Sequence, residues 1–177
     1  LCAMTGSKTA VVTMPIHQNP EETNRGKRHI EWLKDNYSNI VDYHIDLTGT
    51  YEDLKQTISG FNIENTEDYK LSLANTRARI RMSSLYLISG GLKGIVVGTG
   101  NKVEDFGIGF FTKYGDGGVD ISPIGDLMKS EVYSLGQELG IIEDILNAQP
   151  TDGLWDDGRT DEDQLGMSYN ELEWAME

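Results

Sequence analysis

Short apolar runs rich in β-branched residues alternate along this chain with stretches whose apolar residues recur every three or four positions. The runs Thr9–Met14 and Gly94–Gly98 are typical of buried strands. The clearest periodic stretch, Leu71–Ser89, is typical of an amphipathic helix. Strands that alternate with helices form parallel sheets covered by helices on both faces. The sequence therefore predicts an α/β fold with a Rossmann-like parallel sheet.

Further elements follow from local signals. Asn19 and Pro20 fit the N-cap and first position of a helix, and Gly90-Gly91 is expected to end the helix that begins near Leu71. Capping signals, each a Ser or Thr followed three residues later by an acid, stand at Thr160 and Ser168. The remaining predicted elements are strands over Val41–Leu47 and Val119–Ser122, a helix over Tyr51–Ser59, a polar connection over Gly60–Glu67 and a helix after Asp126.

Both ends of the sequence favour a truncated domain. Leu1–Met4 comes just before a Gly-Ser turn and the first strand, as the tail of a helix would, and Leu172–Glu177 stops inside a predicted helix. We expect a single domain over residues 1–177, cut at both ends. Its N-terminal strand is then missing, and Thr9–Met14 and Gly94–Gly98 flank the empty position.

The negative net charge of the chain limits the classes of ligand that it can bind. The chain carries 29 acidic and 15 basic residues, a net charge of −14, so nucleic acid and anionic membranes would repel it. No apolar run approaches the roughly 20 residues that a membrane helix needs. The single cysteine, Cys2, fits a reducing cytoplasm. A phosphorylated ligand would therefore need a few well-placed cations, a helix N-terminus or a metal ion.

A glycine-rich motif follows the predicted strand Gly94–Gly98. In Gly98-Thr-Gly-Asn101 the backbone can approach a ligand closely and offer its amides. Glu104 lies five residues after Thr99, where a carboxylate could hold Mg²⁺ against phosphate oxygens. The tetrad taken alone favours the plainer alternative, a tight turn with a solvated glutamate.

Three other segments carry scarce cations. Lys113 and Asp120 bracket a loop with three glycines in four residues, which serves equally as a ligand loop or as a flexible connection. Asn75–Arg81 places three arginines on the strongest helix, where an exposed basic face is the alternative. Lys129 lies near a helix start, where the helix dipole disfavours a positive charge unless an anion binds there. The alternative is an ordinary surface lysine. The histidines have no metal-ligand spacing.

Taken together, these segments resemble the NAD synthetase family, in its ammonia-dependent branch and within the N-type ATP pyrophosphatase superfamily. The motifs occur in the family's order and cover most of the chain from Asn75 onward. They are Asn75-Thr-Arg-Ala-Arg-Ile-Arg-Met82, Gly98-Thr-Gly-Asn-Lys-Val-Glu104, Gly109-Phe-Phe-Thr-Lys-Tyr-Gly-Asp-Gly-Gly118, Asp120-Ile-Ser-Pro-Ile-Gly-Asp-Leu127 with Lys129, and Pro150-Thr-Asp-Gly-Leu-Trp155 with Thr160-Asp-Glu162. The fold that this implies is the adenine nucleotide alpha hydrolase-like fold.

The resemblance also implies roles for single residues. ATP would be bound by Thr99, Lys129 and Thr151, deamido-NAD by Arg79, Lys113 and Asp120, and Mg²⁺ by Glu104. It further implies a cytoplasmic homodimer with the dinucleotide at the subunit interface. Two family features have no match here: a Ser-Gly-Gly-x-Asp-Ser loop that cradles the pyrophosphate, and a C-terminal segment with a His-Lys pair.

The activity that the resemblance implies is that of a ligase forming a carbon–nitrogen bond. The nicotinate carboxylate of deamido-NAD would attack the α-phosphate of ATP and release pyrophosphate, and ammonia would then displace AMP to give NAD. No covalent enzyme intermediate is expected, and the chain alone is expected to be inactive. Two alternatives stay open: another N-type ATP pyrophosphatase, such as a GMP synthetase or a tRNA-thiolating enzyme, and a non-catalytic nucleotide-binding module.

Overall fold

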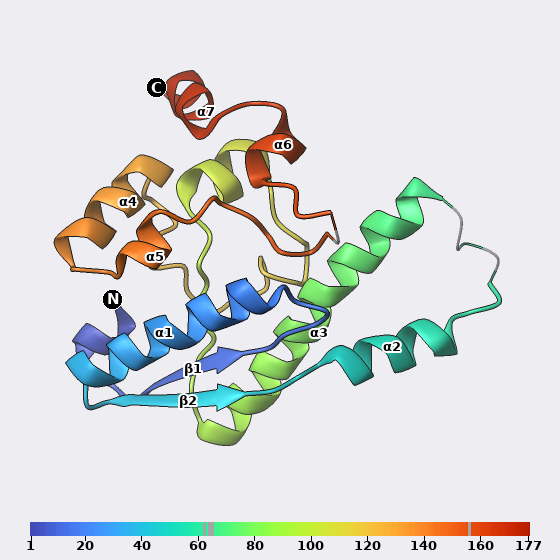
Figure 1. Ribbon diagram of the computed structural model, residues 1–177, viewed down its shortest axis with the longest axis horizontal. Coiled ribbons are helices and arrows are strands. Elements are labelled where there is room, and N and C mark those ends of the chain that lie inside the picture. Colours follow the sequence, from blue (N-terminus) through green and yellow to red (C-terminus); the bar gives the residue numbers. More distant parts are fainter. Residues whose placement is uncertain (62, 64–65, 156) are drawn as a thin grey trace.

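The computed structural model describes residues 1–61, 63, 66–155 and 157–177 (Figure 1). Two strands lie near the start of the chain, and helices make up most of the rest. In chain order the elements are η1 (Cys2–Thr5), β1 (Thr9–Thr13), α1 (Pro20–Asn36), β2 (Ile40–His44), α2 (Thr48–Thr57), α3 (Glu67–Leu92), η2 (Val103–Ile108), α4 (Lys129–Glu138), α5 (Glu143–Leu146), α6 (Asp161–Leu165) and α7 (Tyr169–Met176).

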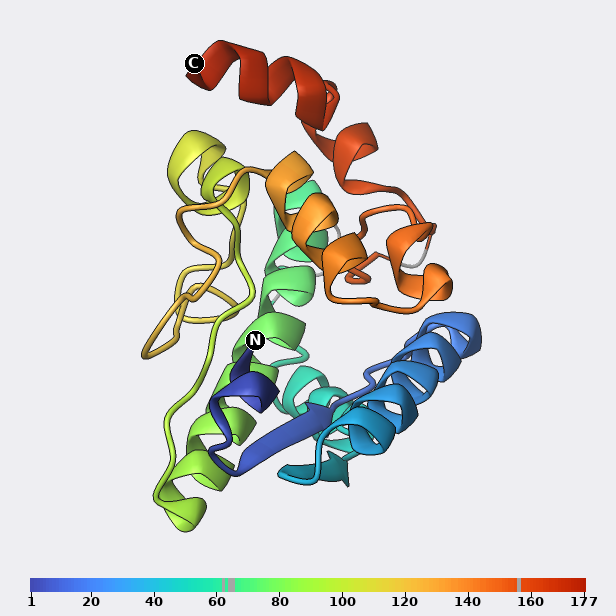
Figure 2. The ribbon, with the colours of Figure 1, turned by 90° about the vertical axis from the view of Figure 1, so that its left-hand side faces the viewer.

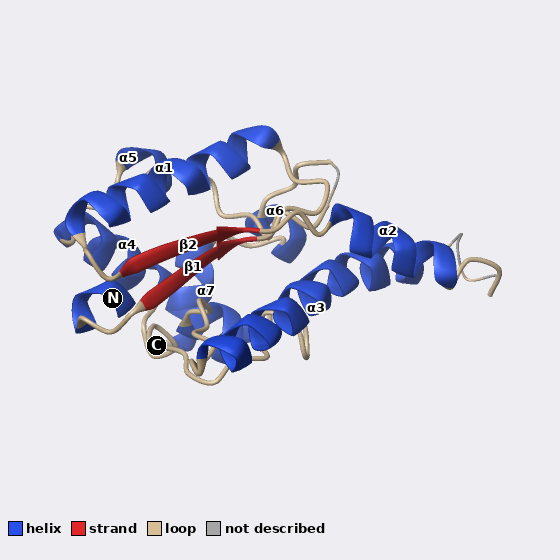
Figure 3. Ribbon diagram, turned by 90° about the horizontal axis from the view of Figure 1, so that it is seen from below, coloured by secondary structure: helices blue, strands red, loops and turns tan. Residues whose placement is uncertain are grey.

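The two strands form a parallel pair. Thr9 lies opposite Ile40 and Thr13 opposite His44, so the carboxyl ends of β1 and β2 meet at one edge. Helix α1 connects them and lies on one face of the pair, while α3 lies on the other (Figure 3). This arrangement confirms the α/β class with a parallel sheet and helices on both faces.

The predicted strands Gly94–Gly98 and Val119–Ser122 are reduced to a single parallel bridge between Val97 and Ile121. The Gly98 amide donates to the Ile121 carbonyl at 2.8 Å, and the Asp120 amide donates to the Val96 carbonyl at 3.0 Å. Between Val97 and β1 lies a cleft, and no strand pairs with Val97 on that side among the described residues. The expectation of two full strands was therefore wrong in extent, although the pairing is parallel.

The start of α1 agrees with the prediction from the sequence, while the end of α3 differs from it. Asn19 caps α1 as predicted, since its side chain accepts from the Glu21 amide at 2.9 Å. Helix α3 does not stop at Gly90-Gly91 but runs to Leu92, and its C-cap Lys93 adopts a left-handed conformation at φ 55°. A glycine inside a helix costs only about 1 kcal/mol, and the Gly94 amide, bonding the Ser89 carbonyl at 2.8 Å, satisfies the helix end. The connection expected over residues 60–67 lies partly outside the described residues.

Two small cores hold the elements together. The first joins the ends of the strands to α2 and α3 through Ile16, Leu47 and Tyr51. The second joins η2 to α7 through Val103, Tyr169 and Leu172. Within the described residues, no helix combines the length and the apolar character that crossing a membrane demands.

Candidate functional site

A cleft of about 1470 Å³ runs along β1 from Thr9 to the carboxyl end at Thr13. One wall comes from Val11–Thr13 and the facing wall from Val97–Thr99, with α1, α3 and α4 closing the sides. In Figure 2, α1 (blue) lies below the segment that carries α4 and α5 (orange). Ligands of open parallel sheets bind at the carboxyl ends of the strands, so the cleft is the candidate site.

Glu104 and Lys129 form the cleft's central charged pair. Glu104 sits on η2, a π-helical turn rather than the open loop expected, and such turns are frequent at functional sites. Lys129 is the first residue of α4, and its ammonium lies 2.7 Å from Glu104 Oε1. The two side chains are only 16% and 19% exposed, so water screens the pair weakly.

Tyr169 and Asp161 extend this pair into a buried network. The Tyr169 hydroxyl donates to Glu104 Oε1 at 2.7 Å and lies 3.1 Å from Asp161 Oδ2. The Lys129 ammonium stands 4.7 Å from the centre of the Tyr169 ring. Tyr169 and Asp161 are both 6% exposed, and Asp161 Oδ1 is buried without a hydrogen-bond partner. Helices η2, α4, α6 and α7 thus meet at one carboxylate.

The environment shifts the pKa values of Glu104 and Asp161 in opposite directions. Burial opposes ionisation of Glu104, but the hydrogen bond and charge of Lys129, with hydrogen bonds from Tyr169 and Asn101, hold its pKa below the usual value. Burial raises the pKa of Asp161, and the nearby Asp152 and Glu104 carboxylates act in the same direction. Glu104 is therefore ionised more readily than Asp161.

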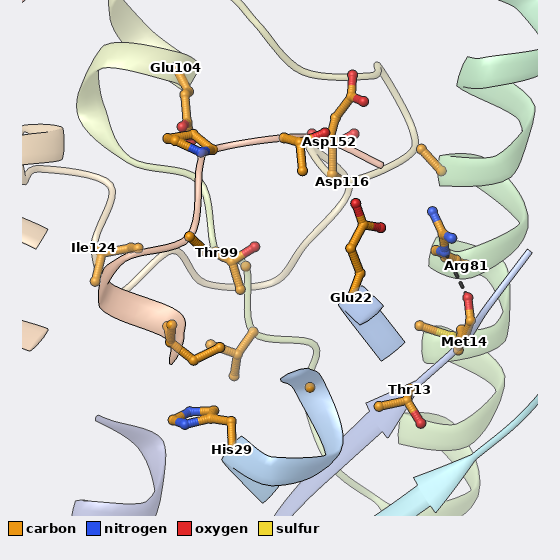
Figure 4. Close-up of a pocket in the computed structure, with 18 of the residues that line it drawn as sticks. Thr13, Met14, Glu22, His29, Arg81, Thr99, Glu104, Asp116, Ile124 and Asp152 are labelled. Atoms are coloured by element: carbon orange, nitrogen blue, oxygen red, sulfur yellow. Dashed lines mark hydrogen bonds between the residues drawn. The ribbon is translucent and has the colours of Figure 1, made fainter. Parts of the chain in front are cut away.

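Thr99 and Thr151 also line the cleft. Thr99 is exposed and faces inward between Glu104 and Ile124 in Figure 4. A Cβ at the preceding Gly98 would approach Val119 Cγ2 to 2.8 Å, which explains the glycine before Thr99. The Thr151 hydroxyl shapes its own loop, since it donates to the Arg159 carbonyl at 3.2 Å and accepts from the Gly153 amide at 3.1 Å.

Arg79, Lys113 and Asp120 lie on a separate, exposed face along α3. Arg79 Nε donates to the Lys113 carbonyl at 3.1 Å, and the Lys113 ammonium lies over the Tyr114 ring at 5.1 Å. Asp120 accepts from the Val96 amide at 2.7 Å and from the Tyr86 hydroxyl at 3.1 Å. The seven residues singled out in the sequence therefore form two groups, four in the cleft and three outside it.

Tyr169 was not singled out from the sequence; it contacts the cleft residues Glu104 and Asp161. Asp161 and Arg81 line the cleft and belong to segments that the sequence picked out, but neither was given a role of its own. Arg81 Nε donates to the Met14 carbonyl at 2.9 Å and its Nη2 to Gln18 Oε1 at 2.9 Å, so it fixes the loop that follows β1 (Figure 4). The arginine-rich helix was the available signal for Arg81. The capping motifs located the starts of α6 and α7, but nothing local indicates that Tyr169 faces Glu104.

One oxygen of Glu104 lacks a strong hydrogen bond among the described residues. Glu104 Oε2 makes only a 3.5 Å contact, with the Asn101 amide, while Oε1 carries both strong bonds. Among the residues that the structure describes, no group of three His, Cys, Asp or Glu side chains could hold a metal by itself. A Mg²⁺ ion at Glu104 would take its other ligands from phosphate and water, which is the usual mode of Mg²⁺ binding.

Comparison with known proteins gives a consistent assignment. The family profile described as NAD synthase matches residues 1–177. The chain is 37% identical over 166 residues to the NH(3)-dependent NAD(+) synthetase of Carboxydothermus hydrogenoformans, covering 94% of this chain and 65% of that protein. It is 52% identical over 103 residues to the synthetase of the same name from Methanococcoides burtonii, covering 58% and 38%.

Solved structures agree in fold. The NMN synthetase of Francisella tularensis superposes with a TM-score of 0.87 at 34% identity, over 98% of this chain and 68% of that one. The NH3-dependent NAD synthetase of Campylobacter jejuni superposes with a TM-score of 0.64 at 30% identity, over 77% and 55%. The chain spans less than two thirds of the curated relatives that it matches. On the match to the family profile along its whole length, the chain belongs to the NAD synthase family.

Proposed function

We propose that the full-length protein amidates the nicotinate carboxylate of deamido-NAD, using ATP and ammonia, and yields NAD, AMP and pyrophosphate. The observation that carries the proposal is the Glu104–Lys129 pair, which lies in a cleft at the carboxyl end of β1. Membership of the NAD synthase family and relatives named NH(3)-dependent NAD(+) synthetase support it. The acidic chain argues against the nucleic-acid substrate of a tRNA-thiolating enzyme.

In this proposal Thr99, Lys129 and Thr151 bind ATP. Lys129 opens α4, so its ammonium and the positive end of the helix dipole act on the same region. Glu104 would hold Mg²⁺ through Oε2. When bound there, the ion would supply positive charge to neutralise the phosphates.

The reaction needs two displacements, because a carboxylate oxygen is too poor a leaving group for direct attack by ammonia. A carboxylate oxygen of the nicotinate attacks the α-phosphorus of ATP, and the bond to pyrophosphate breaks. Ammonia then adds to the acyl carbon, loses a proton, and AMP departs with the former carboxylate oxygen. Lys129 would stabilise the charge that develops on the phosphates.

We propose further that Arg79, Lys113 and Asp120 bind deamido-NAD and that the protein is a homodimer. An exposed site of this kind holds a dinucleotide poorly unless a second surface covers it. Apolar side chains near α3 offer such a surface, since Leu87 is 80% and Ile95 60% exposed. Leu87→Glu should shift the full-length protein toward monomer at micromolar concentration, and a wild-type monomer by sedimentation velocity would refute the dimer.

The cleft also supports a proposal about the fold. β1 pairs with β2 along one edge only among the described residues, and Val97 pairs with Ile121 on the side away from the cleft. We propose that residues 1–177 form part of one domain whose sheet continues in the full-length, cytoplasmic protein with a further strand between Val11 and Val97. That strand would leave the part of the cleft around Glu104 and Lys129 to the ligand. Limited proteolysis should then cut the isolated chain readily near Val97 and leave the full-length protein intact there.

A second candidate function uses a smaller substrate. The Francisella tularensis relative is named an NMN synthetase, and nicotinate mononucleotide presents the same carboxylate as deamido-NAD. The chemistry in the cleft would be unchanged, and only the exposed face would distinguish the substrates. This candidate predicts that the mononucleotide is amidated at least as efficiently as the dinucleotide.

One experiment tests both candidates. The full-length protein is incubated with ATP, Mg²⁺ and ammonium together with either deamido-NAD or nicotinate mononucleotide, and products are separated by liquid chromatography. The proposal expects NAD and AMP in equal amounts, with the higher kcat/KM for deamido-NAD. A higher kcat/KM for the mononucleotide supports the second candidate, and the absence of amide from both substrates overturns the two together.

A further inference from the structure

The Tyr169 hydroxyl is the one neutral donor, among the described side chains, that bonds the Glu104 carboxylate. It donates to Oε1 at 2.7 Å, the same oxygen that accepts from Lys129 at 2.7 Å. Glu104 and Tyr169 are 65 residues apart, so the contact depends on how α7 docks beside η2. Figure 1 shows α7 at one end of the molecule, above η2.

The position of this bond decides which carboxylate oxygen can reach a ligand. Two charge-assisted or short hydrogen bonds occupy Oε1, and they fix the carboxylate plane. Oε2 is left with a single 3.5 Å contact to a backbone amide. A carboxylate held in this way offers one oxygen, in one direction, instead of rotating among several arrangements.

We propose that Tyr169 is a positioning residue, which holds Oε1 of Glu104 so that Oε2 alone is presented to a divalent cation bound with ATP. This inference rests on the proposed function, because it takes the cation to be the metal of the nucleotide complex. Tyr169 also holds Lys129, whose ammonium lies 4.7 Å from the ring centre. The two ATP-facing groups of the cleft are thus oriented by one side chain.

Asp161, on α6, also contacts the Tyr169 hydroxyl. Its Oδ2 lies 3.1 Å from the Tyr169 hydroxyl, and the backbone amide of Tyr169 donates to Glu162 Oε1 at 2.9 Å. Helix α6 therefore fixes both the tip and the base of the tyrosine. Because the ring itself is buried against Val103 and Leu172, its packing and its hydroxyl can be separated by mutation.

The test uses Tyr169→Phe in the full-length protein, which keeps the ring and removes the hydroxyl. Mn²⁺ serves as the probe, and its binding in the presence of a non-hydrolysable ATP analogue is measured by electron paramagnetic resonance. We expect the Mn²⁺ dissociation constant to rise about tenfold, the usual worth of a hydrogen bond to a charged group. The KM for Mg²⁺ should rise in parallel, while kcat at saturating Mg²⁺ recovers.

Tyr43→Phe on β2 is the matched control, because no hydrogen bond of the Tyr43 hydroxyl occurs among the described residues, and it should leave Mn²⁺ binding unchanged. A lower melting temperature for Tyr169→Phe with unchanged Mn²⁺ binding would overturn the inference and leave Tyr169 a packing residue. A double-mutant cycle guards against a folding defect: in a Glu104→Gln background, Tyr169→Phe should weaken Mn²⁺ binding no further. Additive effects would also overturn the inference.

These outcomes separate the inference from the proposed function. Amidation of deamido-NAD by the wild type, with Mn²⁺ binding unaffected by Tyr169→Phe, overturns the inference alone. Weaker Mn²⁺ binding in the variant of a protein that forms no amide overturns the function alone.

Discussion

The cleft and the exposed face along α3 hold their charged residues in opposite ways. In the cleft, Glu104 and Lys129 are mostly buried and bond each other, and Tyr169 fixes them from behind. On the exposed face, Lys113 lies over the Tyr114 ring, and Arg79 bonds a backbone carbonyl. The first arrangement is preorganised before any ligand arrives, while the second is open to water.

This difference suggests a division of labour. Preorganised groups in a poorly hydrated site stabilise developing charge strongly, because they need little rearrangement during the reaction. Exposed cations are screened and contribute mainly to holding a ligand. Substitutions in the cleft should therefore change turnover, and substitutions on the exposed face should change the affinity for deamido-NAD.

The largest effect is expected for Glu104→Gln. The variant keeps the size of the side chain but removes the charge that pairs with Lys129 and would hold the metal. Adenylate formation in the full-length protein should slow on the order of 10²-fold or more, from the loss of about 3 kcal/mol of charge stabilisation. Rapid-quench measurement of pyrophosphate release gives the rate, and added Mg²⁺ should recover part of it. Wild-type turnover with an unchanged Mg²⁺ dependence would show that Glu104 only pairs with Lys129 and does not bind the metal.

Lys113→Ala should have a smaller effect and a different signature. An exposed ammonium contributes about 1 kcal/mol or slightly more to binding an anionic ligand, so KM for deamido-NAD should rise roughly five- to tenfold. KM for ATP should stay nearly constant. Steady-state kinetics with each substrate varied in turn distinguishes the two. An equal loss of ATP affinity would remove the distinction between the two regions.

Asp161→Asn tests the electrostatics of the cleft through pH. Burial raises the pKa of Asp161 in the folded protein above its value in the unfolded chain. Protonated Asp161 therefore stabilises the folded wild type at pH values below the unfolded pKa, and this stabilisation is lost as pH rises through the folded pKa. The amide cannot ionise. The free energy of unfolding of the variant minus that of the wild type should therefore be more positive at about pH 8 than at about pH 4. Urea unfolding of the full-length proteins at both pH values measures it, and a pH-independent difference would contradict the assignment.

The smallest effect is expected at the cap of α7. Ser168 Oγ accepts from the Glu171 amide at 3.3 Å, and the Glu171 carboxylate accepts from the Ser168 amide at 2.8 Å. Ser168→Ala should lower the free energy of unfolding by about 1 kcal/mol, or roughly 2–4 °C in melting temperature. Because α7 carries Tyr169, a small rise in KM for Mg²⁺ should accompany it. Calorimetry and steady-state kinetics supply the two values.

The sequence predicted what depends on local rules. The Asn19 cap and the capping boxes at Thr160 and Ser168 appear where expected, because each is a contact between near neighbours in the chain. The end of α3 was misplaced, since the cost of two glycines is small and the left-handed cap at Lys93 decides the boundary. Gly94–Gly98 fell short of a strand because a ladder depends on a distant partner.

For the candidate site too, local motifs were predictable from the sequence and long-range contacts were not. Glu104, Lys129, Thr99 and Thr151 could be selected from motifs, and the structure places all four in the cleft. Tyr169 could not, because its importance lies in a contact across 65 residues that only tertiary packing creates. Asp161 stood in a motif, but its contact with Tyr169 was not predicted. The roles of Arg79, Lys113 and Asp120 remain predictions that the kinetics above would test.

The most direct test of the proposed function follows the oxygen atom of the substrate. Deamido-NAD labelled with heavy oxygen in its nicotinate carboxylate is converted by the full-length protein with ATP and ammonium, and AMP and pyrophosphate are analysed by mass spectrometry. The two-step displacement predicts one labelled oxygen in each AMP and none in pyrophosphate. Formation of ADP and labelled inorganic phosphate, or of NAD without label in AMP, would contradict activation of the carboxylate by adenylation.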